Sequence, residues 1–199
     1  MNEVLIVKNI SREGPGLIEL LLKARKIHHR IIDLERGEKF SNPESYRAVV
    51  VLGGPDSAND STEKMKLELT QIEEIIRTGT PYLGICLGMQ ALIKAAGGEV
   101  HKHTMKEIGW RDPDGGYFEI ELTQEGREDP LFQGLSSPLK VFQLHGETVR
   151  LGPDMFLLAV GKHCRNQIVR VGRNAYGIQA HFELTQTMFE NWVGQDDDL

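Results

Sequence analysis

The sequence predicts an α/β fold, with an open and mostly parallel sheet that carries helices on both faces. Short apolar runs alternate with amphipathic helical segments over the first hundred residues. The run AVVVLGG, residues 48–54, is apolar without alternation, which is typical of a parallel strand buried on both faces. A helical segment follows each of the runs 48–54 and 81–85. Such strand–helix alternation produces a parallel sheet between two layers of helices.

The elements of the first half follow one another in this pattern. Asp60 and Glu63 form a plausible start for a helix, whose apolar stripe repeats at helical spacing. Gly97 and Gly98 then end another helix. Strands are expected at residues 3–8, 30–34, 48–54 and 81–85, and helices at 16–26, through the stripe Met65, Leu69, Ile72 and Ile76, and at 87–98.

The second half is richer in strands with short connections, so additional antiparallel strands are expected there. The stretch QIVRVGRNAYGIQA, residues 167–180, predicts a hairpin over GRN. A last helix is expected over 184–193, and the acidic end GQDDDL is expected to fray. No repeat or linker interrupts the chain, which predicts one domain over residues 1–199. Strands are expected at 116–122, 139–144, 156–160, 167–171 and 175–180.

Composition and charge narrow the function classes. The chain has 199 residues, 40% hydrophobic and 26% charged, as in an ordinary globular protein. The net charge of −6 argues against nucleic acid as a partner, since phosphate binding needs a basic face. No secretory signal and no apolar run of about 20 residues is found, which argues against a membrane location. With only two cysteines and no disulfide framework, a cytoplasmic location is expected.

Cys86 lies between two glycines where a predicted strand turns into a predicted helix. The spacing Gly-x-Cys-x-Gly matches the nucleophile elbow, in which a sharp turn holds the central residue in a strained conformation. Gly84 and Gly88 are required because side chains there would collide. The N-terminus of the following helix favours the thiolate. The alternative interpretation is a small core cysteine at a glycine-rich turn.

A carbonyl attacked by this sulfur needs donors for its oxyanion. The backbone N–H of Leu87, next to the nucleophile, is one donor by the geometry of an elbow. The turn LGGPDS after the strand at 48–52 is the expected source of the second, at Gly54. The alternative is an ordinary Gly-Pro turn.

Seven histidines compete for the role of general acid and base. His28, His29 and His163 lie in polar stretches and are expected near the surface. Two others, His145 and His181, each precede a glutamate by two residues, so in an extended chain the carboxylate can orient the imidazole. His181 ends an apolar strand directly, which favours it over His145. His101 and His103 have no third ligand nearby in sequence, so no metal site is expected.

Three segments in order, GGP (53–55), LGICLGMQ (83–90) and YGIQAHFE (176–183), resemble the class I glutamine amidotransferase domains. The resemblance runs from the first strand to about residue 190. The segments EIGW (107–110) and FQLHGETV (142–149) are similar to those of free-standing amidotransferase-like proteins related to GMP synthase. The resemblance implies a flavodoxin-like fold.

The resemblance also implies roles for residues. Cys86 would be the nucleophile, His181 the base and Glu183 its orienting partner, with no cofactor. Glutamine would lie near Gln90 and the segment from Gln143 through Leu144 to His145. Two departures stand out. Phe182 replaces the proline of the usual His-Pro-Glu and is expected to change the pocket wall, and Ala180 stands where many relatives have an aromatic residue.

The expected chemistry is cleavage of the γ-amide of glutamine through a γ-glutamyl thioester. No synthetase segment is recognised in the sequence, so an ammonia acceptor would be a partner protein. One alternative is a γ-glutamyl peptidase or amidase that acts on a larger γ-glutamyl conjugate. The other alternative is a weakly active regulatory protein that binds a partner.

Overall fold

The computed structural model describes residues 3–195, so most of the acidic end expected to fray lies outside the described residues. No helix between residues 3 and 195 is both long and apolar enough to span a membrane. The strands are β1 (Val4–Lys8), β2 (His29–Asp33), β3 (Ala48–Val51), β4 (Tyr82–Ile85), β5 (Glu99–Gly109), β6 (Glu119–Leu122), β7 (Leu139–Lys140), β8 (Gln143–Arg150), β9 (Met155–Gly161), β10 (Asn166–Val171) and β11 (Ala175–Ile178). The helices are α1 (Gly16–Ala24), α2 (Glu63–Thr78), α3 (Leu87–Ala95), α4 (Gln124–Glu128) and α5 (Gln186–Val193), with 3₁₀ turns at Pro43–Ser45 and Pro130–Phe132.

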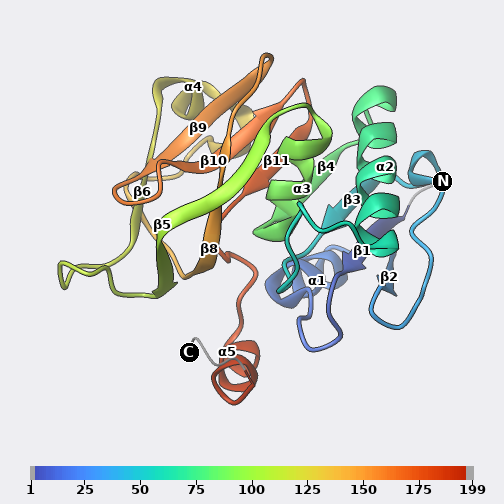
Figure 1. Ribbon diagram of the computed structural model, residues 1–199, viewed down its shortest axis with the longest axis horizontal. Coiled ribbons are helices and arrows are strands. Elements are labelled where there is room, and N and C mark those ends of the chain that lie inside the picture. Colours follow the sequence, from blue (N-terminus) through green and yellow to red (C-terminus); the bar gives the residue numbers. More distant parts are fainter. Residues whose placement is uncertain (1–2, 196–199) are drawn as a thin grey trace.

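One large sheet organises the molecule (Figure 1). Its nine strands lie in the order β2-β1-β3-β4-β11-β10-β9-β6-β7. The neighbours from β2 to β11 pair in parallel, and the remaining pairs are antiparallel. The predicted α/β architecture and its antiparallel additions are therefore confirmed, including the β10–β11 hairpin.

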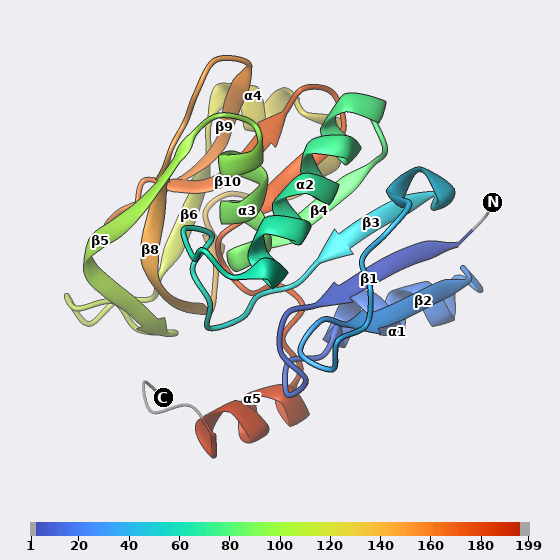
Figure 2. The same cartoon turned by 45° about the vertical axis from the view of Figure 1, so that its right-hand side comes forward.

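Helices cover both faces of the parallel part, with α2 and α3 on one face and α1 on the other (Figure 2). Alternate residues of β3 enter two separate cores: Val49 and Val51 pack in the core with α2 and α3, whereas Val50 packs on the opposite face. Burial on both faces explains why residues 48–51 are apolar without alternation.

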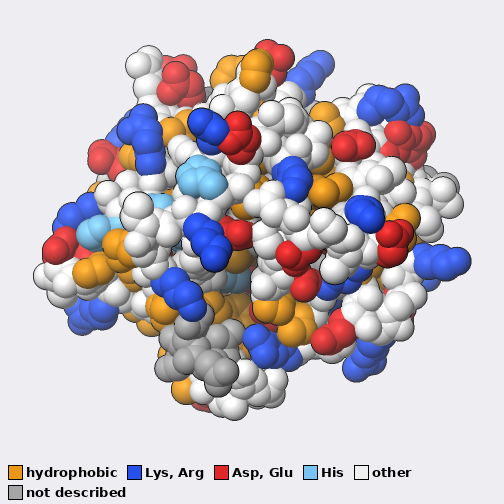
Figure 3. All heavy atoms as spheres, in the orientation of Figure 1, with side chains coloured by type: hydrophobic (Ala, Val, Ile, Leu, Met, Phe, Trp, Pro, Cys, Tyr) orange, Lys and Arg blue, Asp and Glu red, His pale blue; other side chains and the backbone are white. Residues whose placement is uncertain are grey.

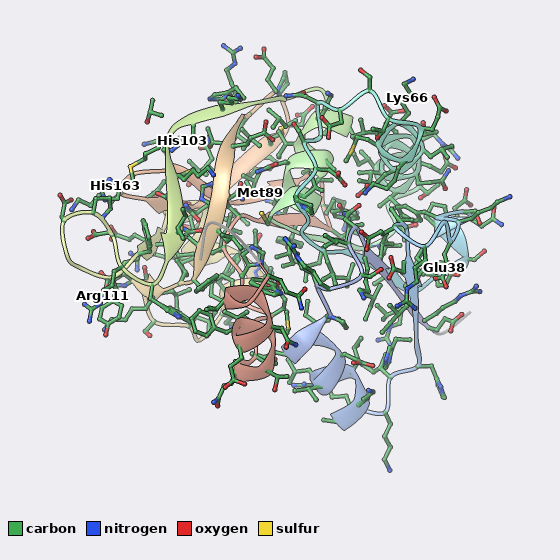
Figure 4. All side chains as sticks on the ribbon, turned by 60° about the horizontal axis from the view of Figure 1, so that its bottom comes forward. Glu38, Lys66, Met89, His103, Arg111 and His163 are labelled. Atoms are coloured by element: carbon green, nitrogen blue, oxygen red, sulfur yellow. The ribbon has the colours of Figure 1, made fainter. Side chains whose placement is uncertain are left out.

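The helix α3 is buried along most of its length. Met89, labelled in Figure 4, is fully buried near the centre of the molecule. A Cβ added at Gly177 of β11 would lie 2.6 Å from its Cγ. The helix thus packs closely on the sheet directly after the turn that contains Cys86.

The register of the parallel strands brings three chain segments to the same edge. Gly84 of β4 pairs with Val51 of β3 on one side and with Gly177 of β11 on the other. The residues that follow these strands therefore leave the sheet side by side. Ligands of open α/β sheets bind at this carboxyl edge.

Three details differ from the expectations. The strand β5 was not predicted, because its charged and polar residues hide a strand that pairs with β8 in a separate two-stranded sheet. The expected strand 139–144 is instead the short β7 and the start of β8, which extends to Arg150. The helix α2 is capped by Thr62, whose hydroxyl accepts from the Met65 N–H, rather than by Asp60.

Candidate functional site

Cys86 occupies a strained turn between β4 and α3. Its φ is 50° and its ψ is −106°, a conformation that non-glycine residues rarely adopt. Its N–H donates to the Ile178 carbonyl at 2.8 Å, and its own carbonyl accepts from the Gln90 N–H at 3.1 Å. Such strain costs about 1–3 kcal/mol and persists only where the surroundings enforce it.

The glycines on either side of Cys86 are enforced by backbone contacts. A Cβ at Gly84 would lie 2.4 Å from the carbonyl carbon and oxygen of Gly88. A Cβ at Gly88 would lie 2.2 Å from the Val51 carbonyl oxygen on β3. Steric crowding therefore explains the Gly-x-Cys-x-Gly spacing, as expected. A side chain at Gly84 would collide with Gly88, whereas a side chain at Gly88 would collide with the neighbouring strand β3.

His181 and Glu183 form a buried pair. The Nδ1 of His181 lies 2.7 Å from the Oε1 of Glu183, and both side chains are 2% exposed. Burial alone would lower the pKa of His181, but the Glu183 carboxylate and the Cys86 side chain outweigh it and raise this pKa well above its usual value. The pair can therefore hold a proton at the imidazole next to the sulfur.

Aromatic side chains cover the His181 ring. Trp192 of α5 lies edge-on, with ring centroids 5.0 Å apart, and Phe142 lies 6.4 Å away in the same manner. Trp192 itself is 2% exposed. The helix α5, which lies apart from the large sheet in Figures 1 and 2, thus supplies an apolar lid for the histidine.

Cys86 and His181 both lie next to Gly53, in the loop after β3. A Cβ added at Gly53 would lie 3.2 Å from the Cε1 of His181 and 3.5 Å from the Cβ of Cys86. The sulfur accepts from the Nε2 of Gln179 at 3.5 Å and donates to the Leu144 carbonyl at 3.7 Å. Sulfur and imidazole are therefore neighbours, with an amide donor on the sulfur.

A cavity of about 610 Å³ opens at this pair. Its wall combines charged groups of both signs with backbone, and acidic and basic side chains are also interspersed over the face shown in Figure 3. Ser57 donates to both carboxylate oxygens of Glu147 in this wall, at 3.0 and 2.9 Å. The lining residues besides Cys86 and His181 include Arg12, Glu13, Gly54, Asp56, Gln90, Lys106 and Leu144–Glu147.

The two residues expected to form the oxyanion hole lie beside the sulfur. Gly54 lines the cavity. Its missing side chain leaves room for Asn9, since an added Cβ would lie 2.8 Å from the Asn9 Cβ. Leu87 buries its side chain in the core and is the first residue of α3, where helix N–H groups have no partner within the helix.

The expected substrate-binding residues divide into two groups. Gln90, Leu144 and His145 line the cavity, although both ring nitrogens of His145 face protein acceptors. Gln143 does not line it. Its side chain lies on the same face of β8 as that of His145, since residues two apart in a strand point the same way, and it donates to Gln167 at 2.9 Å.

The site residues that the sequence analysis missed include Gln179, Glu107, Lys106 and Trp192. Gln179 contacts the sulfur, and its spacing of two residues from His181 was a usable signal, since such residues share one side of an extended chain. Glu107 and Lys106 belong to the unpredicted β5, and Trp192 reaches the site only through the fold. Phe182 is 38% exposed and does not line the cavity, so the expectation that it changes the pocket wall is wrong.

Two groups among the described residues could offer three metal ligands within 4.8 Å: Glu107 with His145 and Cys164, and Asp112 with Asp114 and His163. The first is buried and bonded internally, and in the second Lys162 is ion-paired with both aspartates. Neither group includes His101 or His103.

Known proteins share this architecture. A glutamine amidotransferase from Thermotoga maritima superposes with a TM-score of 0.87 at 30% identity, over 97% of this chain and 81% of that structure. A glutamine amidotransferase from Methylobacillus flagellatus superposes with a TM-score of 0.89 at 27% identity, over 98% of this chain and 76% of that structure.

Sequence relatives point the same way. The glutamine amidotransferase-like protein YfeJ of Salmonella typhimurium is 31% identical over 76% of this chain and 63% of its own length. A glutamine-hydrolysing GMP synthase subunit from Sulfurisphaera tokodaii is 30% identical over 75% of this chain and 77% of its own length. The match covers only 27% of the GMP synthase of Thermosipho melanesiensis, so the chain spans a minor part of that relative. Because the profile of the family Glutamine amidotransferase class-I also matches residues 17–195, the chain belongs to the class I glutamine amidotransferases.

Proposed function

We propose that this protein hydrolyses the γ-amide of glutamine to glutamate and ammonia, with Cys86, His181 and Glu183 as its catalytic triad. The observation that carries the proposal is the strained Cys86, which lines a cavity next to a buried His181–Glu183 pair. Nucleophile, base and orienting carboxylate in this relation are typical of acyl transfer through a covalent intermediate.

In the first half of the reaction, the Cys86 thiol gives its proton to His181, and the sulfur attacks the γ-carbonyl and forms a carbon–sulfur bond. The Gly54 and Leu87 N–H groups hold the oxyanion. The intermediate then collapses as His181 protonates the amide nitrogen, the carbon–nitrogen bond breaks and ammonia leaves. The raised pKa of His181 fits a group that must hold this proton next to the sulfur.

In the second half, His181 takes a proton from water, and the resulting hydroxide attacks the γ-glutamyl thioester. The carbon–sulfur bond breaks, glutamate is released and the proton returns to the sulfur. Glu183 keeps the imidazole oriented in both halves, and the ring of Trp192 excludes bulk water from it. Gln90, Leu144 and His145 bind the substrate at the cavity wall, which Gln143 does not line.

The test uses the purified chain with glutamine, with ammonia and glutamate measured in parallel. Equal amounts of both products are expected from the unmodified protein, and neither from C86A. Absence of product from glutamine and from γ-glutamyl dipeptides alike would reject hydrolysis at this site.

A second candidate is a γ-glutamyl peptidase or amidase. It is favoured by the cavity, because about 610 Å³ falls in the range that holds ligands of drug size. Cleavage of a γ-glutamyl dipeptide at least about ten times more efficiently than glutamine, or about 1.4 kcal/mol in transition-state binding, would establish it over the first.

We also propose that residues 1–199 form one amidotransferase domain that delivers ammonia to a synthetase partner. The name of the relative from Sulfurisphaera tokodaii, a synthase subunit, supports a partner. Stimulation of glutamine hydrolysis by a lysate of the source organism is expected, and full turnover by the purified chain alone would count against a partner.

A further inference from the structure

Glu107 and His145 face each other across the two-stranded sheet next to the cavity. The two residues are paired in the register of β5 and β8. The Nε2 of His145 lies 2.9 Å from the Oε2 of Glu107, and the two side chains are 1% and 2% exposed. The mechanism above places His145 at the cavity wall but gives Glu107, its buried ionisable partner, no role.

The hydrogen bonds of the pair fix where its protons are. The Nδ1 of His145 lies 2.9 Å from the Glu147 carbonyl oxygen, which can only accept, so Nδ1 carries a proton. The other nitrogen faces Glu107, whose carboxylate also accepts from the Cys164 N–H at 2.8 Å and from the Gln167 amide at 3.2 Å. A carboxylate that receives three donors is stabilised as the anion, so Nε2 carries a proton as well.

The same contacts also act on the pKa of the Glu107 carboxyl. Burial raises the pKa of this carboxyl, but the hydrogen bond and charge of His145, together with the Cys164 N–H, outweigh burial and lower the pKa below its usual value. Other charged groups near the ring are His103 and Lys106 on β5, of which His103 is labelled in Figure 4, and the Glu147 carboxylate on β8.

His145 belongs to the segment of β8 that lines the cavity next to Cys86 and Gln90. On one side of His145, the Leu144 carbonyl accepts from the Cys86 sulfur at 3.7 Å. On the other side, the Glu147 carbonyl accepts from the Gln90 amide at 3.4 Å, as well as from His145. The ring thus holds the segment of β8 that contacts both Cys86 and Gln90.

The backbone ladder alone holds this segment poorly. The register of β5 and β8 is interrupted between Lys102 and Glu107, where several residues of β5 oppose a single residue of β8. Glu107 lies at the end of this interruption. Its bonds to the Cys164 N–H and to Gln167 connect the two-stranded sheet to the large sheet.

We propose that Glu107 is a positioning residue that holds His145 as a buried imidazolium and thereby fixes the β8 wall of the cavity against Cys86. The kinetic part of this inference rests on the proposed glutamine hydrolysis. The protonation of His145 and the position of the wall do not, so they can be tested without substrate.

The first test is NMR of the full chain labelled with ¹⁵N-histidine, with the His145 signals identified by their loss in H145Q. In the unmodified protein, both ring nitrogens are expected to carry protons at pH 7 and at pH 8, because each of them faces an acceptor. In E107Q, whose amide can donate to Nε2, the ring is expected to become singly protonated at pH 8. A ring with one bare nitrogen at pH 7 in the unmodified protein would overturn the proposal.

The second test measures steady-state kinetics, which depend on the position of the β8 wall of the cavity. E107Q is expected to raise KM for glutamine by about tenfold while kcat changes less than about threefold. The conservative E107D, which keeps the charge, should recover the doubly protonated ring and part of the lost affinity. The matched control is E99Q, on the same strand but exposed. A fall in kcat with KM unchanged would overturn the positioning role.

The two proposals fail in different ways. If the unmodified protein does not turn over glutamine, the proposed function is rejected. The rate at which iodoacetamide alkylates Cys86 then reports on the position of the β8 wall instead. An alkylation rate that differs at least about threefold between E107Q and the unmodified protein supports the positioning role. Equal rates in E107Q, E99Q and the unmodified protein would overturn it.

Discussion

His181 and Glu183 pair through their side chains at 2.7 Å although neither belongs to a strand. His145 and Glu147 have the same spacing within β8, yet the ring contacts only the backbone carbonyl of Glu147. The Glu147 carboxylate accepts from Ser57 instead. The bend after β11 brings the two side chains of the first pair together, whereas the pleat of a strand keeps those of the second pair apart.

Replacement of Cys86 by alanine is expected to lower glutamine hydrolysis by at least about 10³-fold while the fold persists. A glutamine-like chloroketone should label Cys86 in the unmodified protein and leave Cys164 unlabelled, since burial first of all raises the pKa of the Cys164 thiol to about 11. Mass spectrometry of the labelled peptides provides the measurement. Equal labelling of both thiols would contradict the assignment.

Replacement of His181 by alanine is expected to lower kcat by about 10²–10⁴-fold, because the general acid and base is lost. Replacement of His145 by alanine should act mainly on KM. The exposed His28 provides the control, with both constants unchanged in H28A. Steady-state kinetics that rank His145 above His181 in kcat would show that the wrong histidine has been chosen.

Replacement of Gly88 by alanine is expected to destabilise the protein by about 3 kcal/mol, since the new methyl would collide with the backbone of β3. Gly14 is the matched control, because a Cβ there meets no atom within 4 Å. Urea denaturation of both variants measures the difference. If G88A and G14A unfold alike, the close contact between α3 and β3 is not present.

Replacement of Trp192 by alanine is expected to cost about 3–5 kcal/mol of stability, as for other buried aromatic residues. The neighbouring Val193 is 46% exposed, so V193A should change stability by less than about 0.5 kcal/mol. Chemical denaturation, monitored by the fluorescence of Trp110, can measure the free energy of unfolding of both variants. Similar values for both variants would mean that α5 does not dock on His181.

Stability is expected to depend on the ionisation of Glu68. Burial raises the pKa of this carboxyl from 4.5 to about 7, even though Asn9 donates to it. Between these pH values the folded state keeps a proton that the unfolded state has lost. The free energy of unfolding should therefore fall by about 3 kcal/mol as the pH rises from 4.5 to 7, and then level off.

The variant E68Q should remove this pH dependence, because an amide does not titrate. E73Q, exposed on the same helix, should keep it. Urea midpoints measured from pH 4.5 to 8 provide the comparison. A slope that is the same in E68Q as in the unmodified protein would assign the effect to another group.

The parallel half of the fold was predictable, because strands buried on both faces are apolar throughout and alternate with helices of clear periodicity. The turn at Cys86 was predictable for a different reason, since backbone contact at Gly84 and Gly88 leaves only glycine as a choice. Both signals are local in sequence.

The remaining features depend on contacts distant in sequence. The strand β5 is mostly polar and becomes a strand only by pairing with β8, 34–51 residues later. Trp192 reaches His181 through the docking of α5. Gln143 was expected at the cavity but bonds to Gln167, 24 residues later, which only the fold brings near.

The backbone conformation of Cys86 has an evolutionary consequence. Glycine adopts a φ of 50° more easily than cysteine does, so C86G is expected to relieve some of the strain while it removes the sulfur. Selection for a stable fold and selection for the reaction therefore oppose each other at this codon. If the proposed reaction were no longer selected, the strain at this position would no longer be opposed by a need for the sulfur.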